Sequence, residues 1–191
     1  MRKIIVLEHI SQDGVIQAPG GQTEDPSNDF IQGGWIYPYS DEMLGNEIRN
    51  QMKSSFDLLL GRFTYDLWAM YWPNNDGWPE ANQAIKYVTS NTMDVASWKP
   101  SIILKNDIIE QIKEIKNQDG KDIHIWGSSN LLHTLFAYDL VDELCLFVYP
   151  VTLGIGKKLF EEGEIPKMYQ MVESKITTKG VKIVKYKRYI K

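Results

Sequence analysis

The segment that most constrains the fold of this chain is residues 122–160, in which two apolar runs flank a helical pattern. The first run, DIHIW, ends at Gly127, and the leucines that follow it recur at helical spacing. The second run, residues 144–151, is rich in β-branched and aromatic residues, as buried strands are. The segment therefore predicts a strand, a helix and a second strand, which is the repeating unit of a parallel sheet.

The polar turn of that unit, Gly127-Ser128-Ser129, begins the predicted helix. A helix N-terminus presents free backbone N–H groups and the positive end of the helix dipole, which together suit a phosphate. The turn nevertheless lacks the three spaced glycines of the dinucleotide-binding fingerprint. Taken alone, the turn is better explained as a simple cap of the helix.

Composition places the chain among soluble globular proteins. Its 191 residues are 43% apolar and 24% charged, which is enough for one well-packed domain over residues 1–191. The formal net charge is −4, and the lysines and arginines form no long block. Because affinity for nucleic acid depends mainly on clustered cations, a nucleic-acid partner is not expected.

Cysteine and histidine usage argues against two further kinds of site. Cys145 is the only cysteine, so one chain can form neither a disulfide nor a cysteine-based metal site. His9, His124 and His133 lack the spacing of metal ligands, and no metal is expected. The N-terminal apolar run is too short for a signal peptide, and no run is long enough to cross a membrane. We expect a cytoplasmic protein that does not bind a membrane.

The other apolar runs extend the alternation of strands and helices along the chain. Strands are predicted at residues 4–7, 58–60, 85–90 and 101–104, helices at 41–56 and 108–115, and a closing pair of strands from residue 169 that turns at Lys179-Gly180. This order predicts an α/β domain with a mostly parallel central sheet, an antiparallel C-terminal edge and helices on both faces. In such sheets, ligands bind at the carboxyl ends of the strands.

A long polar segment, residues 18–40, follows the first predicted strand and is far longer than a usual connection. Long ordered loops are commonly lids or site walls, but a flexible insertion fits the composition as well. The aromatic side chains of Trp35 and Tyr37 can pack and so order the segment, and both residues are candidates to line a substrate cavity. Packing of both rings under their own loop is the alternative.

Two further strand ends carry groups suited to an anionic ligand. Arg62 and Thr64 follow the strand that ends at Gly61, and a guanidinium can hold a phosphate with two hydrogen bonds. The structural alternative is a surface arginine bonded to loop carbonyls. Thr89-Ser90 ends the next predicted strand with hydroxyl groups. These ends are predicted to lie along one edge of the sheet with the Gly127 turn.

Several segments, in order, resemble one family: the dihydrofolate reductase fold, and within it the reductase domain of riboflavin biosynthesis and its free-standing bacterial relatives. The resemblance covers nearly the whole chain. It is carried by SQDGVI at 11–16, LLGRFTY at 59–65, KYVTS at 86–90, IWGSS at 125–129, LVDEL at 140–144 and LGIGKKLF at 153–160.

The resemblance implies NADPH as the cofactor. Gly61, Arg62 and Thr64 match the family's turn that meets the adenosine 2′-phosphate and the pyrophosphate. Thr89-Ser90 matches a strand end near the adenosine. Gly127-Ser128-Ser129 matches the turn that lies against the pyrophosphate and the nicotinamide.

The chain also departs from the family's pattern. The family's paired glycines become Gly127-Ser128, and its Ser-Leu-Asp-Gly becomes Ser-Gln-Asp-Gly. True dihydrofolate reductases hold the pteridine with a carboxylate on the first helix, after a Trp-x-x-Pro run. Here Trp35, Pro38 and Asp41 match that run only with shifted spacing, which argues against folate reduction.

Reduction of a C=N or C=O bond also requires a proton, and Asp13 and Asp41 are the candidate acids. A turn-forming role for Asp13 and a helix-capping role for Asp41 are the competing interpretations. The leading hypothesis is an NADPH-dependent reductase of a small heterocycle, such as a pteridine or the phosphoribosylaminouracil of riboflavin synthesis. The alternative is a nucleotide-binding module without turnover. A homodimer is compatible with the alternating tail strands.

Overall fold

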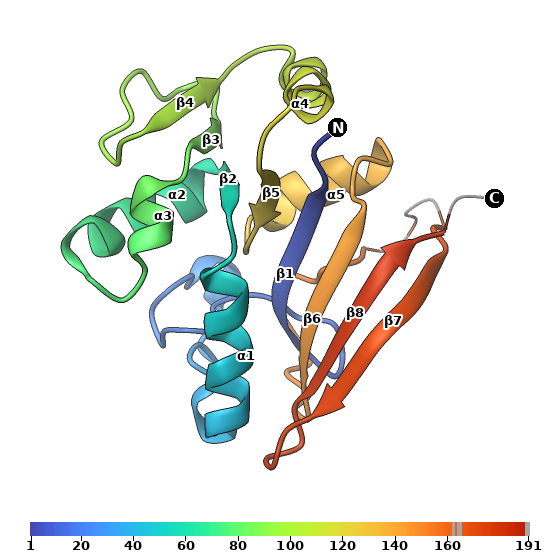
Figure 1. Cartoon of the computed structure of the whole chain (residues 1–191). Coiled ribbons are helices and arrows are strands. Elements are labelled where there is room, and N and C mark those ends of the chain that lie inside the picture. The colour runs from blue at the N-terminus through green and yellow to red at the C-terminus, as the bar shows by residue number, and fades with distance from the viewer. Residues whose placement is uncertain (162, 164–165, 190–191) are drawn as a thin grey trace.

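Eight strands form one sheet in the order β4-β3-β2-β5-β1-β6-β8-β7 (Figure 1). The neighbours from β4 to β6 pair in parallel, and β8 pairs antiparallel with both β6 and β7. This computed structural model describes residues 1–161, 163 and 166–189. The strands are β1 Ile4–Ser11, β2 Phe56–Gly61, β3 Lys86–Thr89, β4 Ser101–Leu104, β5 Asp122–Ile125, β6 Glu143–Tyr149, β7 Tyr169–Ile176 and β8 Lys182–Arg188.

Five α-helices in the described part of the chain cover the two faces of this sheet. Alternate side chains of the buried strands point to opposite faces, so both faces are apolar and both are covered by helices. Leu58 and Leu60 of β2 pack in one core cluster with the first three helices, whereas Leu59 packs in a second cluster with the last two. The predicted α/β class, with helices on both faces and an antiparallel edge, is confirmed. The helices are α1 Glu42–Met52, α2 Arg62–Tyr71, α3 Pro79–Gln83, α4 Ile108–Asn117 and α5 Ser129–Ala137.

Three strands whose ends build the site lie next to one another in the middle of the sheet. β5 pairs in parallel with β2 on one side and with β1 on the other. The turns that lead from β2 into α2 and from β5 into α5 are therefore neighbours at the same edge. Gly61 and Ser128, which are far apart in sequence, meet there.

The helix predicted at residues 41–56 is wrong at its C-terminal end. α1 ends at Met52, and Phe56 begins β2. The Phe56 ring is buried and stacks on His124 of the neighbouring strand, with the ring centroids 4.8 Å apart. Phe56 continues the helical spacing of apolar residues in the sequence, but it is the first residue of a strand.

The long segment 18–40 is folded back on itself rather than extended. The Gly34 amide donates to the carbonyl of Ala18 at 2.9 Å, and the Gln17 side chain donates to the carbonyls of Asp25 and Ser27. Gly33 lies so close to the backbone of Gly21 that a side chain would not fit. These contacts make the segment a wall beside the carboxyl ends of the strands.

The antiparallel edge ends in β7, which has no neighbour on its outer side among the described residues (Figure 1). Met171, Val172 and Ile176 are exposed on this strand. An edge of this kind is where a second copy could pair, and the homodimer stays a prediction. Within the described ranges, no helix has the length and apolar character needed to cross a membrane.

Candidate active site

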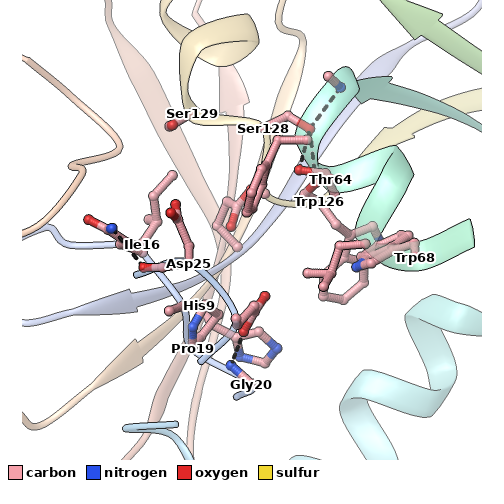
Figure 2. Close-up of a pocket in the computed structure, with 18 of the residues that line it drawn as sticks. His9, Ile16, Pro19, Gly20, Asp25, Thr64, Trp68, Trp126, Ser128 and Ser129 are labelled. Atoms are coloured by element: carbon pink, nitrogen blue, oxygen red, sulfur yellow. Dashed lines mark hydrogen bonds between the residues drawn. The ribbon is translucent and has the colours of Figure 1, made fainter. Parts of the chain in front are cut away.

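A cleft of about 700 Å³ opens at the carboxyl ends of β1, β2 and β5 (Figure 2). One side is formed by the turns that begin α2 and α5. The opposite side is formed by α1, the end of α2 and part of the folded segment 18–40. The cleft has a polar end, formed by Gly61, Arg62, Thr64, Gly127, Ser128, Ser129 and Asn130, and an aromatic end, formed by Ile36, Ile48, Met52, Trp68, Trp72, Trp78 and Trp126.

The two turns of the polar end are joined by one side chain. The Ser128 hydroxyl accepts a hydrogen bond from the Gly61 amide at 3.0 Å and donates to the Thr64 hydroxyl at 3.1 Å (Figure 2). Ser128 takes the left-handed backbone conformation, with φ of 65°, which glycine adopts more easily. The serine in place of a second glycine therefore accepts a strained backbone and holds the two turns together.

Neither helix at the polar end is capped by a side chain. Gly61 precedes α2 and has no side chain to offer, and the Ser128 hydroxyl is bonded elsewhere. Gly127 has φ of 60°, and a Cβ at this residue would lie 3.3 Å from the Thr64 hydroxyl. The first-turn N–H groups of both helices are thus available to one anionic ligand, because the first turn of a helix has no internal acceptors.

Two cations line the cleft among the described residues, and each has a carboxylate partner. Arg62 forms an ion pair with Asp66, one turn further along α2. Lys157 forms an ion pair with the buried Asp25, with 2.6 Å between Nζ and Oδ2. The Arg62 pair is half-exposed, so the guanidinium can exchange this partner for a phosphate at little cost.

A buried carboxyl group lies in the second half of β1. Glu8 is 2% exposed, and its Oε1 has no hydrogen-bond partner among the described atoms. Burial raises the pKa of Glu8 well above its usual range. The backbone amide of Gly127 opposes this shift, and the charge of Glu24 adds to it. Burial therefore favours the protonated, neutral form of the Glu8 carboxyl.

The neighbouring His9 points to the other face of the sheet but lines the same cleft. Its Nδ1 is hydrogen-bonded to the Tyr149 hydroxyl at 2.8 Å. Burial lowers the pKa of His9 to about 4, so the ring is neutral at physiological pH.

The aromatic end is a continuous series of ring contacts. The Trp78 ring lies 5.4 Å from Trp68, 5.3 Å from Trp72 and 6.2 Å from Trp126, each edge to face. Trp126 is 7% exposed, and its indole Nε1 has no hydrogen-bond partner in the described part of the chain. This end offers flat apolar surface together with one unused donor.

The sequence matches the family described as the RibD C-terminal domain over residues 2–185. The chain belongs to the RibD C-terminal domain family. It is 29% identical over 196 residues to the uncharacterized protein YyaP of Bacillus subtilis strain 168, covering 97% of this chain and 94% of that protein.

Solved structures of other proteins confirm the fold of this family member. A Shewanella sp. PV-4 protein named for riboflavin biosynthesis has a TM-score of 0.66 at 20% identity, covering 98% of this chain and 99% of that one. A pyrimidine reductase-like protein of Corynebacterium diphtheriae has a TM-score of 0.61 at 11% identity, with coverages of 100% and 93%. Dihydrofolate reductase of Enterococcus faecalis, complexed with NADP(H) and RAB-propyl, has a TM-score of 0.59 at 13% identity, with coverages of 97% and 96%. The chain has a reductase-type, dihydrofolate reductase-like fold.

In this RibD C-terminal domain, six of the residues predicted to bind a cofactor come together at the polar end of the cleft. They come from two turns that are more than 60 residues apart in the chain, and their shared role stays a prediction. The six are Gly61, Arg62, Thr64, Gly127, Ser128 and Ser129.

Thr89 and Ser90 are not among the residues that line the cleft, and their predicted place near the adenosine stays a prediction. They end β3, one strand beyond β2. The Ser90 hydroxyl accepts from the Met93 amide at 3.0 Å, and the Thr89 hydroxyl donates to the Leu60 carbonyl at 3.4 Å. Both hydroxyls therefore stabilise the backbone beside the site.

Asp13 and Asp41, the acids expected from the sequence, also lie outside the cleft. Asp13 accepts hydrogen bonds from the Ser11 hydroxyl and from the amides of Leu153 and Gly154. Asp41 caps α1 by accepting from the Leu44 amide at 2.8 Å. Because these bonds occupy both carboxylates away from the lining residues, the structure supports the turn-forming and capping interpretations.

Trp35 and Tyr37 likewise do not line the cleft. Trp35 is buried under its own loop and donates from Nε1 to the Gln17 carbonyl at 2.8 Å. Tyr37 is 62% exposed and its hydroxyl donates to the Gly20 carbonyl. The segment does form a wall, but the residues that face the cleft are the neighbouring Ile36 and residues 18–20 and 24–25.

Sequence reasoning missed Glu8 and His9 as cleft residues. The signal was present, since a carboxylate and an imidazole interrupt an apolar run at the end of a buried strand. Three of the four tryptophans of the aromatic end lie within residues 68–78, and only the fold brings Trp126 to them.

Proposed function

We propose that this protein is an NADPH-dependent reductase that acts on a small heterocyclic substrate. The observation that carries the proposal is the pair of uncapped helix N-termini, joined by Ser128, at one end of a cleft whose other end is aromatic. The anionic pyrophosphate of a dinucleotide matches the polar end, and the aromatic end is left for a flat heterocyclic substrate. The Enterococcus dihydrofolate reductase of similar fold is a complex with NADP(H).

The residues of the polar end fit the phosphates of NADPH. The first-turn amides of α2 and α5 would hold the pyrophosphate, with the hydroxyls of Thr64 and Ser129 as further donors. Arg62, at the first position of α2, would bind the 2′-phosphate after exchanging Asp66 for it. Gly127 would let the pyrophosphate approach the backbone closely, because the space that a Cβ would need there is already tight.

When bound, the reduced nicotinamide supplies a hydride. The protein must then provide the proton, and Glu8 is the group we assign to this task. Glu8 lines the cleft, burial raises the pKa of its carboxyl and so favours the protonated form, and one of its oxygens has no partner among the described residues. The buried surroundings that raise its pKa also keep water away from the reacting groups.

Asp13 and Asp41 lie outside the cleft, so a catalytic role for the protein depends on Glu8 as the acid. If Glu8 is not the acid, the alternative is favoured, which is a nucleotide-binding module without turnover. Titration of the protein with NADPH and with NADH, followed by tryptophan fluorescence, tests the first step. We expect saturable quenching that is tighter for NADPH. Absence of quenching by both would sink the cofactor proposal.

The second step is NADPH oxidation, followed by absorbance, with a panel of pteridines, pyrimidines and fused bicyclic heterocycles. Consumption of NADPH with at least one of them is the expected result. Binding of NADPH without oxidation across the whole panel would support the binding module instead.

A further inference from the structure

We infer that the aromatic end of the cleft binds a planar, uncharged molecule that carries no phosphate group and presents at least one hydrogen-bond acceptor. The inference rests on the proposed function and narrows its substrate class. It excludes the phosphoribosyl compounds that riboflavin synthesis would supply. Its basis is the distribution of charge, apolar surface and unused donors in the cleft.

The charge distribution argues against an anionic substrate. Among described residues, the only lysine and arginine side chains lining the cleft are Arg62 and Lys157, and both are ion-paired. Arg62 and the helix N-termini of the polar end are already required for the phosphates of the cofactor. Towards β1 the cleft offers the carboxyls of Glu8 and Glu24. A second phosphate would find no free cation there, and neither carboxyl group would attract it.

The surface of the aromatic end is flat and apolar. α1 presents Ile48 and Met52 to the cleft, and the turn after α2 presents Trp72. Half-buried indole and thioether groups of this kind bind planar rings through dispersion and ring-edge contacts. A sugar phosphate would leave this apolar surface unused.

Two polar groups at this end are suited to a neutral ring. The buried Nε1 of Trp126 is a donor without a described partner, and an unused buried donor is costly unless a ligand accepts from it. His9 lies 6.0 Å from Trp126, measured between ring centroids, and Tyr149 occupies its Nδ1. Nε2 of His9 is left to contact a ligand. A ring nitrogen or a carbonyl oxygen would satisfy the indole donor.

The test uses a matched pair of probes, quinoxaline and quinoxaline-2-carboxylate. Quinoxaline is planar and uncharged with two ring-nitrogen acceptors, and the carboxylate differs by one negative charge. Isothermal titration calorimetry is done with the full chain in the presence of saturating NADP⁺. We expect quinoxaline to bind at least about tenfold more tightly than its carboxylate. Equal or tighter binding of the carboxylate overturns the inference.

Two variants place the probes at the aromatic end. Met52→Lys adds a cation there and should reverse or abolish the preference for quinoxaline. Met70→Lys is the matched control, since Met70 is on α2, 74% exposed and outside the cleft lining, and it should keep the preference. If both lysines have the same effect, the probes bind elsewhere and the inference fails.

Trp126→Phe keeps an aromatic ring but removes the unused donor, and quinoxaline should then bind about fivefold more weakly. An unchanged affinity would contradict recognition through Nε1. A circular dichroism spectrum and melting curve of each variant show that it is folded.

The outcomes separate this inference from the proposed function. If NADPH and NADP⁺ do not bind but quinoxaline is preferred in the same way without cofactor, the cofactor proposal fails and the subsite remains. If NADPH binds and is oxidised only with phosphorylated substrates, the reductase proposal holds and the inference about the substrate class fails.

Discussion

The polar and aromatic ends of the cleft are built in different ways. The polar end consists mainly of backbone groups from two turns, and Ser128 fixes their relative position through Gly61 and Thr64. The aromatic end consists of side chains from segment 18–40, α1, the end of α2, the segment between α2 and α3, and the turn after β5. Backbone amides recognise an anion whatever molecule carries it, whereas a set of side chains can be changed residue by residue. We therefore expect the polar end to bind a common cofactor and the aromatic end to determine the substrate.

Glu8 lies in the same cleft, and its replacement should give the largest effect. Glu8→Gln keeps the shape of the side chain but removes the acid, so turnover should fall about 100-fold. NADPH affinity, which depends on the polar end, should change little. Steady-state kinetics and fluorescence titration of the same sample measure the two quantities. Unchanged turnover would show that the proton comes from elsewhere, and Glu24 would be the next carboxyl of the cleft to replace.

The same variant has a pH signature that a structural defect would not have. In the folded state the pKa of Glu8 is raised, whereas in the unfolded chain the glutamate has its ordinary pKa of about 4.3. Wild-type stability therefore falls as pH rises from that value towards the raised pKa, and Glu8→Gln removes this loss. Urea unfolding at pH 5 and pH 8 should show that the variant gains relative to wild type at the higher pH. Glu110→Gln, at an exposed surface pair, is the control and should show no such trend.

Arg62→Ala should give the next largest effect, confined to the polar end. Loss of a charge-assisted contact to a phosphate should weaken NADPH binding by roughly 10- to 100-fold. NADH lacks the 2′-phosphate and should lose little. Fluorescence titration with both cofactors measures the ratio, with Arg49→Ala on the exposed side of α1 as the control. Equal losses for both cofactors would contradict the assignment of the 2′-phosphate to Arg62.

Asp13→Asn and Asp41→Asn should have the smallest effect on turnover, within about twofold of wild type, because neither carboxylate reaches the cleft. Asp41 should instead influence stability. The hydrogen bond from the Leu44 amide, together with that from Thr178, lowers the pKa of Asp41 to about 2. Its contribution is present above the ordinary value of 3.8 and is lost as pH falls towards 2. A large loss of turnover with normal stability would restore these residues as catalytic candidates.

The polar end could be predicted from the sequence because each of its turns is encoded locally. A glycine after an apolar run, followed by hydroxyl or guanidinium groups and a helical pattern, indicates a helix N-terminus at the end of a strand. The bridge formed by Ser128 could not be predicted. It depends on the pairing of β2 with β5, which no local pattern specifies.

The remaining errors have physical causes of the same kind. Asp13 and Trp35 were expected in the cleft because an acid and an aromatic ring can serve a substrate, but nearby backbone groups bind them first. Phe56 continued a helical spacing and yet belongs to a strand, because its ring stacks on His124 across the sheet. In each case tertiary contacts decided between two local possibilities.

The structure of the protein bound to NADPH, determined by crystallography, tests the central claim most directly. We expect the pyrophosphate oxygens to accept hydrogen bonds from first-turn amides of both α2 and α5, with Arg62 at the 2′-phosphate. The surface formed by Met52, Trp68 and Trp72 should remain open for a substrate. Phosphates bound away from these two helix N-termini, or a cofactor ring that fills the aromatic end, would contradict the division of the cleft.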